Sequence, residues 1–182
     1  PIPAAWMGHS YEQMLQDVRT HTTDVLQCLK DHGVKPKWAK IGNETTNGML
    51  WNSKDRIPIQ EESMGHLELN PEQYAGFINA GAEAAKSVFP DIITLVHLDS
   101  GFDQNLYDRN IGTLIKYGAQ FDQVGMSLYP YWAAKEHGMD DADQVISDCI
   151  ENIKHVWDKF GKDCLIVETG FLDDPEHPEV LE

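Results

Sequence analysis

Residues 92–98 read Ile92-Ile93-Thr94-Leu95-Val96-His97-Leu98, an almost unbroken run of apolar and β-branched side chains. A strand that has one solvated face alternates apolar and polar residues, whereas a strand covered on both faces shows a continuous apolar run. The run therefore predicts a buried strand of a parallel sheet.

Helix-like and strand-like segments alternate on both sides of this run. Apolar residues recur three and four positions apart in each expected helix, and capping residues mark several ends. Ser10 is the expected N-cap of the first helix and Gly33 its stop. The expected helices are residues 10–32, 71–87, 103–117 and 140–160, the strands are 38–42, 92–98, 121–128 and 164–168, and loops are expected at 43–70 and, rich in aromatic residues, at 129–132.

This order of elements implies parallel pairing of the strands through right-handed crossovers. Two architectures fit it, a doubly wound sheet and a (β/α)₈ TIM barrel. A barrel takes about 250 residues, whereas this chain has 182 residues and four recognisable strands. If the fold is a barrel, the chain is a partial one. No repeat or domain boundary divides it, so residues 1–182 are treated as one domain.

Composition excludes several classes of partner. The chain has 30 Asp and Glu residues against 14 Lys and Arg residues, a formal net charge of −16. Nucleic acids and anionic membrane surfaces bind clustered cations, so neither is an expected partner. No apolar run is long enough to cross a bilayer. Three widely spaced cysteines without a CxxC pair argue against a disulfide framework.

Polar side chains follow each expected strand, at the end where parallel α/β folds place their sites. The four strand ends are Gly42-Asn43-Glu44, His97-Leu98-Asp99, Ser127-Leu128-Tyr129 with Trp132 just beyond, and Glu168-Thr169-Gly170. Carboxylates, an amide, an imidazole and aromatic rings should therefore converge on one edge of the sheet.

Glu44 and Glu168 have the chemistry that glycoside hydrolysis needs. One carboxylic acid protonates the departing oxygen, and the other carboxylate attacks the sugar or activates a water molecule. Repulsion and unequal burial can split the pKa values of such a pair. Because both steps use carboxyl groups, no cofactor is expected. No metal site is expected either, since the run Asp140-Asp141-Asp143 lacks the Glu at position twelve of a calcium loop.

The segment from Trp38 to Trp51 reads WAKIGNETTNGMLW and resembles the fourth-strand motif of glycoside hydrolase family 53, the arabinogalactan endo-β-1,4-galactanases. Residues 23–36, 97–101, 121–132 and 166–170 agree with that family in order and spacing. Thr45 and Ser100 depart mildly from the family pattern. Strands one to three and strand eight of the family's barrel are not recognisable.

The resemblance implies a TIM barrel, here covering about strands four to seven, that cleaves internal β-1,4-galactosidic bonds with retention. By position, Glu44 matches the acid/base and Glu168 the nucleophile. Asn43 matches the residue that holds the sugar 2-hydroxyl, and Tyr129 a tyrosine near the nucleophile. Four further residues are expected to bind substrate: Trp51, His97, Asp99 and Trp132. If the protein is retaining, the Glu44 and Glu168 carboxyls should lie about 5–5.5 Å apart.

Other functions remain open at this point. A related barrel glycosidase that cuts xylan, mannan or cellulose would use the same two acids. An inactive glycan-binding remnant, or an engineered half barrel that assembles with its complement, would also fit, because an open segment exposes two strand edges. The expected partners are thus galactan and the remainder of the barrel. A galactanase of this kind would be extracellular, cell-surface or periplasmic and degrade pectin side chains, with its signal peptide outside the given residues.

Overall fold

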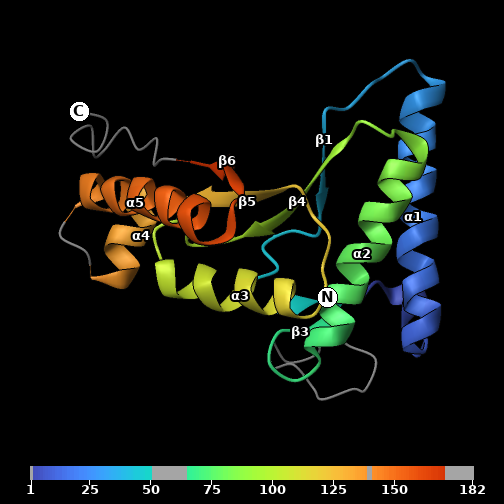
Figure 1. The fold of residues 1–182 in the computed structure, drawn as a ribbon, viewed down its shortest axis with the longest axis horizontal. Helices are drawn as coiled ribbons and strands as arrows, with labels where there is room; N and C mark the ends of the chain where they lie inside the picture. The colour runs from blue at the N-terminus through green and yellow to red at the C-terminus, as the bar shows by residue number, and fades with distance from the viewer. Residues whose placement is uncertain (1, 51–64, 139–140, 171–182) are drawn as a thin grey trace.

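The computed structural model describes residues 2–50, 65–138 and 141–170. Helices and strands alternate along this part of the chain (Figure 1). The expected helices and the four expected strands are confirmed, within a few residues of their predicted ends. The elements are η1 (Ala4–Trp6), α1 (Tyr11–Asp31), β1 (Trp38–Ile41), β2 (Gly48–Met49), β3 (Gly65–His66), α2 (Pro71–Val88), β4 (Ile93–Leu98), α3 (Gln104–Lys116), β5 (Gln123–Leu128), α4 (Pro130–His137), α5 (Ala142–Phe160) and β6 (Asp163–Thr169).

Strands β1, β4, β5 and β6 form one parallel sheet, in which their spatial order is also their order along the chain. In a doubly wound sheet the order of the strands reverses at a switch point. The order of these four strands does not reverse. Right-handed crossovers that all advance in one direction place their helices on one face of the sheet. The arrangement is therefore a stretch of barrel wall, and the partial barrel is confirmed.

The main core lies between the outer face of the sheet and the helices. Alternate residues of a strand point to the same face, so Val96 and Leu98 of β4 and Val124 and Met126 of β5 face the helices together. They pack in one cluster with buried side chains of α2, α3 and α5, which are Tyr74, Ala75, Ile78, Tyr107, Ile111, Leu114, Cys149 and Val156. Burial of this apolar face holds each helix against its strand.

A capping box starts α1, and a glycine lets α2 pack closely against β1. The Ser10 side chain accepts from the Gln13 backbone N–H, and the Gln13 side chain reaches back to the Ser10 N–H, a capping box that starts α1. Helix α2 runs beside α1 in Figure 1 and presents Gly81 to β1. A Cβ on Gly81 would lie 2.7 Å from Cγ2 of Ile41, so only glycine lets this helix approach the strand so closely.

An ion-pair network joins α3 to α5 on the protein surface. The Asp108 carboxylate accepts from His155 Nε2 at 2.7 Å and from Lys159 Nζ at 2.6 Å. Partial burial opposes ionisation of Asp108, but hydrogen bonds from Lys159 and His155 outweigh it and lower the pKa of Asp108. The network therefore depends on an ionised aspartate.

Two segments differ from their expected form. The aromatic segment at residues 129–132 is not only a loop, because Pro130 occupies the first turn of α4 and Gly138 ends that helix in a left-handed conformation. The long loop at 43–70 contains the antiparallel pair β2 and β3. Both elements are too short for the periodicity on which the sequence analysis depended.

The three cysteines, Cys28, Cys149 and Cys164, are all free, in line with the expected lack of a disulfide framework. Among the described residues, no helix has the length and apolar character that crossing a bilayer requires.

Candidate active site

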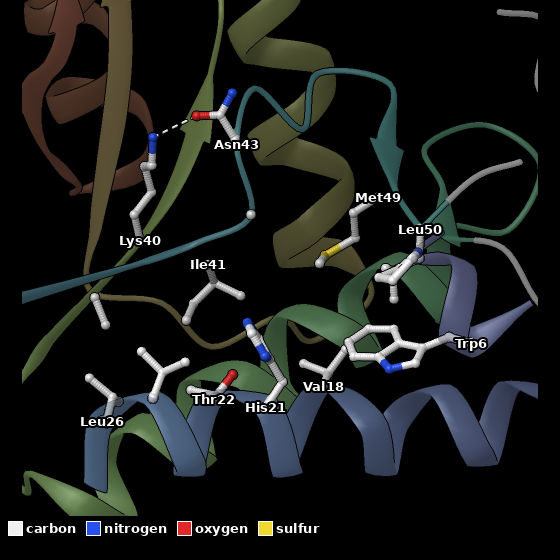
Figure 2. A pocket seen from close by; sticks show the side chains of 14 residues that line it. Trp6, Val18, His21, Thr22, Leu26, Lys40, Ile41, Asn43, Met49 and Leu50 are labelled. Atoms are coloured by element: carbon white, nitrogen blue, oxygen red, sulfur yellow. Dashed lines mark hydrogen bonds between the residues drawn. The ribbon is translucent and has the colours of Figure 1, made fainter. Parts of the chain in front are cut away.

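A cavity of about 680 Å³ lies between α1 and β1 and is mostly apolar (Figure 2). Val18 and Leu26 of α1 line one side of it, and Lys40 and Asn43 lie across from that helix. Neither Glu44 nor Glu168 lines this cavity. The position of the two carboxylates therefore indicates the site better than the size of the cavity does.

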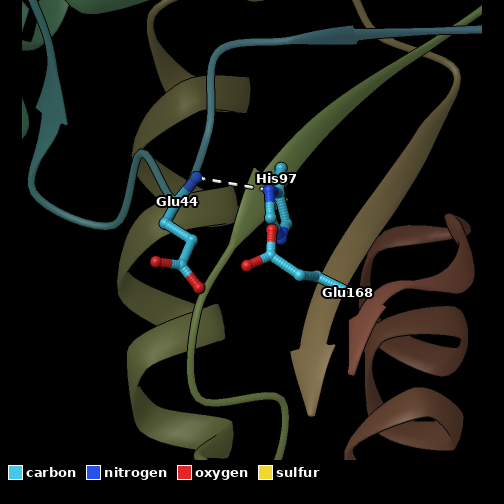
Figure 3. Close-up of side chains that lie close together, drawn as sticks. All are labelled: Glu44, His97 and Glu168. Atoms are coloured by element: carbon cyan, nitrogen blue, oxygen red, sulfur yellow. Dashed lines mark hydrogen bonds between the residues drawn. The ribbon is translucent and has the colours of Figure 1, made fainter. Parts of the chain in front are cut away.

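The carboxyl ends of β1, β4 and β6 bring three titratable side chains together, as expected from the strand ends. One side-chain ligand atom each of Glu44, His97 and Glu168 lies within 4.8 Å of the other two (Figure 3). Glu44 follows β1 after Gly42 and Asn43, His97 is in β4, and Glu168 is in β6. Residues 124 positions apart in the chain, 168 − 44, thus face each other across the sheet.

The position of Glu168 depends on an irregularity in strand pairing. The register of β5 and β6 shifts by one residue after Met126, so Ser127 lies opposite Glu168 rather than Val167. Bulges of this kind occur next to active sites, where they redirect a side chain. Here the shift places Glu168 beside the inner-face residue Ser127.

Glu44 sits in a strained turn that its neighbours stabilise. Its φ of +46° lies in the left-handed region, which is unusual for a residue with a Cβ. The Glu44 backbone N–H donates to His97 Nδ1 at 3.3 Å, and the Thr45 N–H donates to the His97 carbonyl at 2.8 Å. Two hydrogen bonds to one residue of β4 therefore hold the backbone of Glu44 in place.

A buried polar network supports the same turn from behind. The Tyr74 hydroxyl is shared with Thr45 Oγ1 at 2.7 Å and donates to the Thr45 carbonyl at 2.9 Å. Asn110 Nδ2 donates to the Thr46 carbonyl at 2.7 Å. Buried polar groups are stable only when they are paired, and these pairs tie the turn to α2 and α3.

Glu168 has a different environment. Tyr129 donates to Glu168 Oε1 at 2.8 Å, and this bond is the main reason that the pKa of Tyr129 is raised. Lys40 Nζ lies 3.7 Å from Glu168 Oε2 and donates to Asn43 Oδ1 at 2.6 Å. A hydroxyl and an ammonium group thus face the Glu168 carboxylate. The lysine also fixes the orientation of the Asn43 amide, which leaves the amide NH₂ group to donate elsewhere.

His97 is fully buried, and both of its ring nitrogens have protein partners. Nε2 lies 2.8 Å from Ser127 Oγ, and Nδ1 accepts from the backbone of Glu44. Burial lowers the pKa of His97, Lys40 lowers it further, and the two glutamates oppose the shift. A metal ion held by the cluster of Glu44, His97 and Glu168 would have to displace one of these hydrogen bonds, so the residues present do not favour a metal site.

A second cavity of about 380 Å³ adjoins Glu44. Asp99, Tyr129 and Trp132 are among its lining residues, and Trp132 packs edge-on against Tyr129 with ring centroids 5.8 Å apart. Burial raises the pKa of Asp99. The structure therefore brings Asp99, Tyr129 and Trp132 to the side of Glu44. Trp51 lies outside the described residues.

Several residues of the site had no role predicted from the sequence. Lys40 and Ser127 contact the two glutamates, and Phe102, Glu136 and His137 line the second cavity. A signal did exist for Lys40, because a charged residue between apolar neighbours in a strand needs a partner. The same reasoning applies to Ser127, a hydroxyl in a buried strand.

Comparisons with known proteins agree with this geometry. An uncharacterized protein in the bgaB 5′ region of Niallia circulans is 34% identical over 97% of this chain and 44% of its own length. A probable arabinogalactan endo-β-1,4-galactanase A of Aspergillus fumigatus is 26% identical over 93% of the chain and 44% of its own length. The solved GH53 catalytic domain of Ignisphaera aggregans superposes with a TM-score of 0.76 at 28% identity, over 96% of this chain and 43% of that one.

The chain spans less than half the length of these relatives. The family model described as Glycosyl hydrolase family 53 matches residues 1–177, nearly all of the sequence. The parallel sheet of four strands agrees with a partial barrel of this family. This chain belongs to glycosyl hydrolase family 53.

Proposed function

We propose that the protein is a retaining endo-β-1,4-galactanase that hydrolyses internal bonds of galactan or arabinogalactan. The observation that carries the proposal is the approach of Glu44 and Glu168, whose nearest ligand oxygens lie within 4.8 Å. Retaining glycosidases hold their carboxyl groups about 5–5.5 Å apart, whereas inverting enzymes leave about 6.5–9.5 Å for a water molecule. The approach of one oxygen from each carboxylate supports direct attack by a carboxylate, and the separation of the carboxyl groups themselves stays a prediction.

The surroundings of Glu44 and Glu168 differ, and the difference supports one role for each glutamate. Glu168 accepts from Tyr129 and lies near the Lys40 ammonium, and both contacts stabilise a negative charge. We therefore assign Glu168 as the nucleophile that attacks the anomeric carbon as the glycosidic bond breaks. Glu44 borders the cavity that contains Asp99 and Trp132, and we assign it as the acid that protonates the departing oxygen.

The second step returns the enzyme to its starting state. Water attacks the anomeric carbon, its proton passes to the Glu44 carboxylate, and the ester bond to Glu168 breaks. Asn43, oriented by Lys40, is placed to bind the 2-hydroxyl of the cleaved sugar. Asp99, Tyr129, Trp132 and Trp51 are proposed to contact neighbouring sugars. The fungal relatives are named as arabinogalactan endo-β-1,4-galactanases, which supports galactan as the substrate.

Activity is proposed to need the rest of the barrel. Strands β1 and β6 each have one edge without a neighbour among the described residues. On β1, Trp38 and Lys40 are exposed although they alternate with the helix-facing residues Ala39 and Ile41. Further strands that pair with β1 and β6 would cover both edges and enclose the site. We also propose that the protein acts outside the cytoplasm, where pectin side chains are found.

The test uses the protein as its gene encodes it. Galactan, xylan, mannan and carboxymethylcellulose are each incubated with the protein, and reducing ends are counted. Galactan hydrolysis with β-configured first products, seen by proton NMR, is expected. Glu168→Gln should abolish turnover but keep galactan binding. Glu44→Gln should reduce the turnover of galactan about 10²–10⁴-fold. Glu68→Gln, which changes a surface ion pair with Arg109, is the matched control.

Three outcomes would contradict the proposal. Cleavage of another glycan with no action on galactan would move the protein to a different substrate class. First products of the α configuration would exclude retention. Galactan binding without hydrolysis in the wild-type protein would favour a glycan-binding half barrel, for which the unpaired outer edges of β1 and β6 among the described residues are the supporting observation.

A further inference from the structure

Three hydrogen bonds connect the Glu44 backbone to the Glu44 carboxylate through two residues of neighbouring strands. The Glu44 N–H donates to His97 Nδ1 at 3.3 Å, the dashed line in Figure 3. His97 Nε2 lies 2.8 Å from Ser127 Oγ. Ser127 Oγ donates to Glu44 Oε1 at 2.6 Å. The circuit begins and ends on the same residue.

The direction of each hydrogen bond in this circuit follows from the bond between the Glu44 N–H and His97 Nδ1. A backbone N–H can only donate, so His97 Nδ1 must be the acceptor and cannot carry a proton. In the neutral ring the proton is then on Nε2, which donates to Ser127 Oγ. The serine hydroxyl in turn donates to Glu44 Oε1, its only acceptor among the described residues. A distance of 2.6 Å is typical of a hydroxyl that donates to a carboxylate.

We propose that His97 and Ser127 are positioning residues that hold Glu44 for proton transfer and direct its acidic proton to Oε2. This inference rests on the proposed function. Because the Ser127 hydroxyl occupies Oε1, the proton given to the leaving group is carried by Oε2. The same histidine fixes the strained backbone of Glu44, so the main chain and the carboxylate are oriented together.

Burial favours this role for His97 over the expected direct contact with sugar. His97 is 0% exposed and Ser127 is 2% exposed, and the two hydrogen bonds of the ring use both of its nitrogens. The charged groups facing the ring are Lys40, Glu44 and Glu168, and the net effect of burial and charge lowers the pKa of His97. A protonated ring would lose the acceptor that the Glu44 N–H needs, so the lowered pKa supports the neutral form.

The first test reads the tautomer without any need for activity. The protein is produced with isotope-labelled histidine, and the His97 ring signals are identified by their loss in His97→Phe. Nitrogen NMR at pH 7.5 should show the neutral Nε2–H tautomer, and the ring should take up a second proton only below the ordinary pKa of histidine. A proton on Nδ1, or an imidazolium ring at pH 7.5, would overturn the proposal.

The second test uses the dependence of rate on the leaving group. A dinitrophenyl glycoside of galactobiose needs little acid assistance, whereas the phenyl glycoside and galactan need it fully. Ser127→Ala should lower kcat about 10²-fold on the phenyl glycoside, the size of effect caused by a misplaced catalytic group. It should leave kcat on the dinitrophenyl glycoside within about threefold, and Ser127→Thr should restore most of the loss.

Matched variants separate positioning from general destabilisation. His97→Gln keeps a donor for Ser127 and should retain more activity on the phenyl glycoside than His97→Phe. Thr94→Val removes a buried hydroxyl from β4 that bonds Asp122 instead, and should affect both substrates equally or not at all. Equal losses of kcat on both glycosides in Ser127→Ala would refute the positioning role of Ser127. Lack of galactanase activity in the wild-type protein would refute the proposed function, while the NMR result would still decide the hydrogen-bond circuit.

Discussion

The buried hydroxyl of Tyr74 offers the sharpest test of how the turn at Glu44 is supported. Tyr74→Phe removes only the hydroxyl and keeps the ring, which is 0% exposed in the core. The change deletes the hydrogen bonds at 2.7 and 2.9 Å to Thr45. Thr45 keeps other partners, because its hydroxyl is free to donate to the His97 carbonyl at 3.2 Å once the tyrosine oxygen is removed, and its carbonyl accepts from Asn110 at 3.4 Å.

The remaining partners set the size of the expected effect. A buried polar group left unpaired costs about 1–3 kcal/mol, and partial compensation places Tyr74→Phe near the lower end, at about 1–2 kcal/mol. In a protein of this size a loss of 1 kcal/mol lowers the Tm by about 2–4 °C. Urea unfolding followed by tryptophan fluorescence gives the free energy of unfolding, and calorimetry gives the Tm.

A second tyrosine provides the control. Tyr117 packs against the same core, and its hydroxyl has no hydrogen-bond partner in the part of the chain that the structure describes. Tyr117→Phe should therefore change the free energy of unfolding by less than about 0.5 kcal/mol. The reasoning fails if the two variants lose the same stability, since the buried network would then contribute nothing.

Three further outcomes are expected. Asp108 has a lowered pKa in the folded state, so its stabilising effect is complete above its ordinary pKa of 3.8 and is lost as the pH falls through the lower folded pKa. Asp108→Asn should therefore weaken the loss of stability at acidic pH. An unchanged dependence of stability on acidic pH would rule the network out. Lys40→Met should lower kcat/KM about tenfold by releasing the Asn43 amide, with Lys40→Arg closer to wild type; equal rates in all three proteins would exclude this role. Gly81→Ala should destabilise the protein by about 1–3 kcal/mol through overpacking on β1, whereas Gly112→Ala, with no atom closer than 4.0 Å to its new Cβ, should stabilise α3; the opposite order in thermal unfolding would contradict the packing argument.

Much of the fold could be predicted from local patterns. The run at residues 92–98 and the helical spacing of its neighbours depend on burial of a face, which repeats with a fixed period in the sequence. The motif around Glu44 marked the first acid, and the strand-end rule marked the second. Short elements such as α4 were missed, because eight residues with one proline, one aromatic pair and one alanine pair carry little periodicity.

The sequence by itself determined the alternation of helices and strands and the polar residues that end each strand, because these depend on neighbours in the chain. Only the tertiary structure decided how close Glu44 and Glu168 lie, since the one-residue register shift after Met126 depends on contacts between two strands. The same holds for His97. Its residue type fits a sugar ligand or a buried support equally well, and it became a support because packing buried the ring and gave both of its nitrogens protein partners.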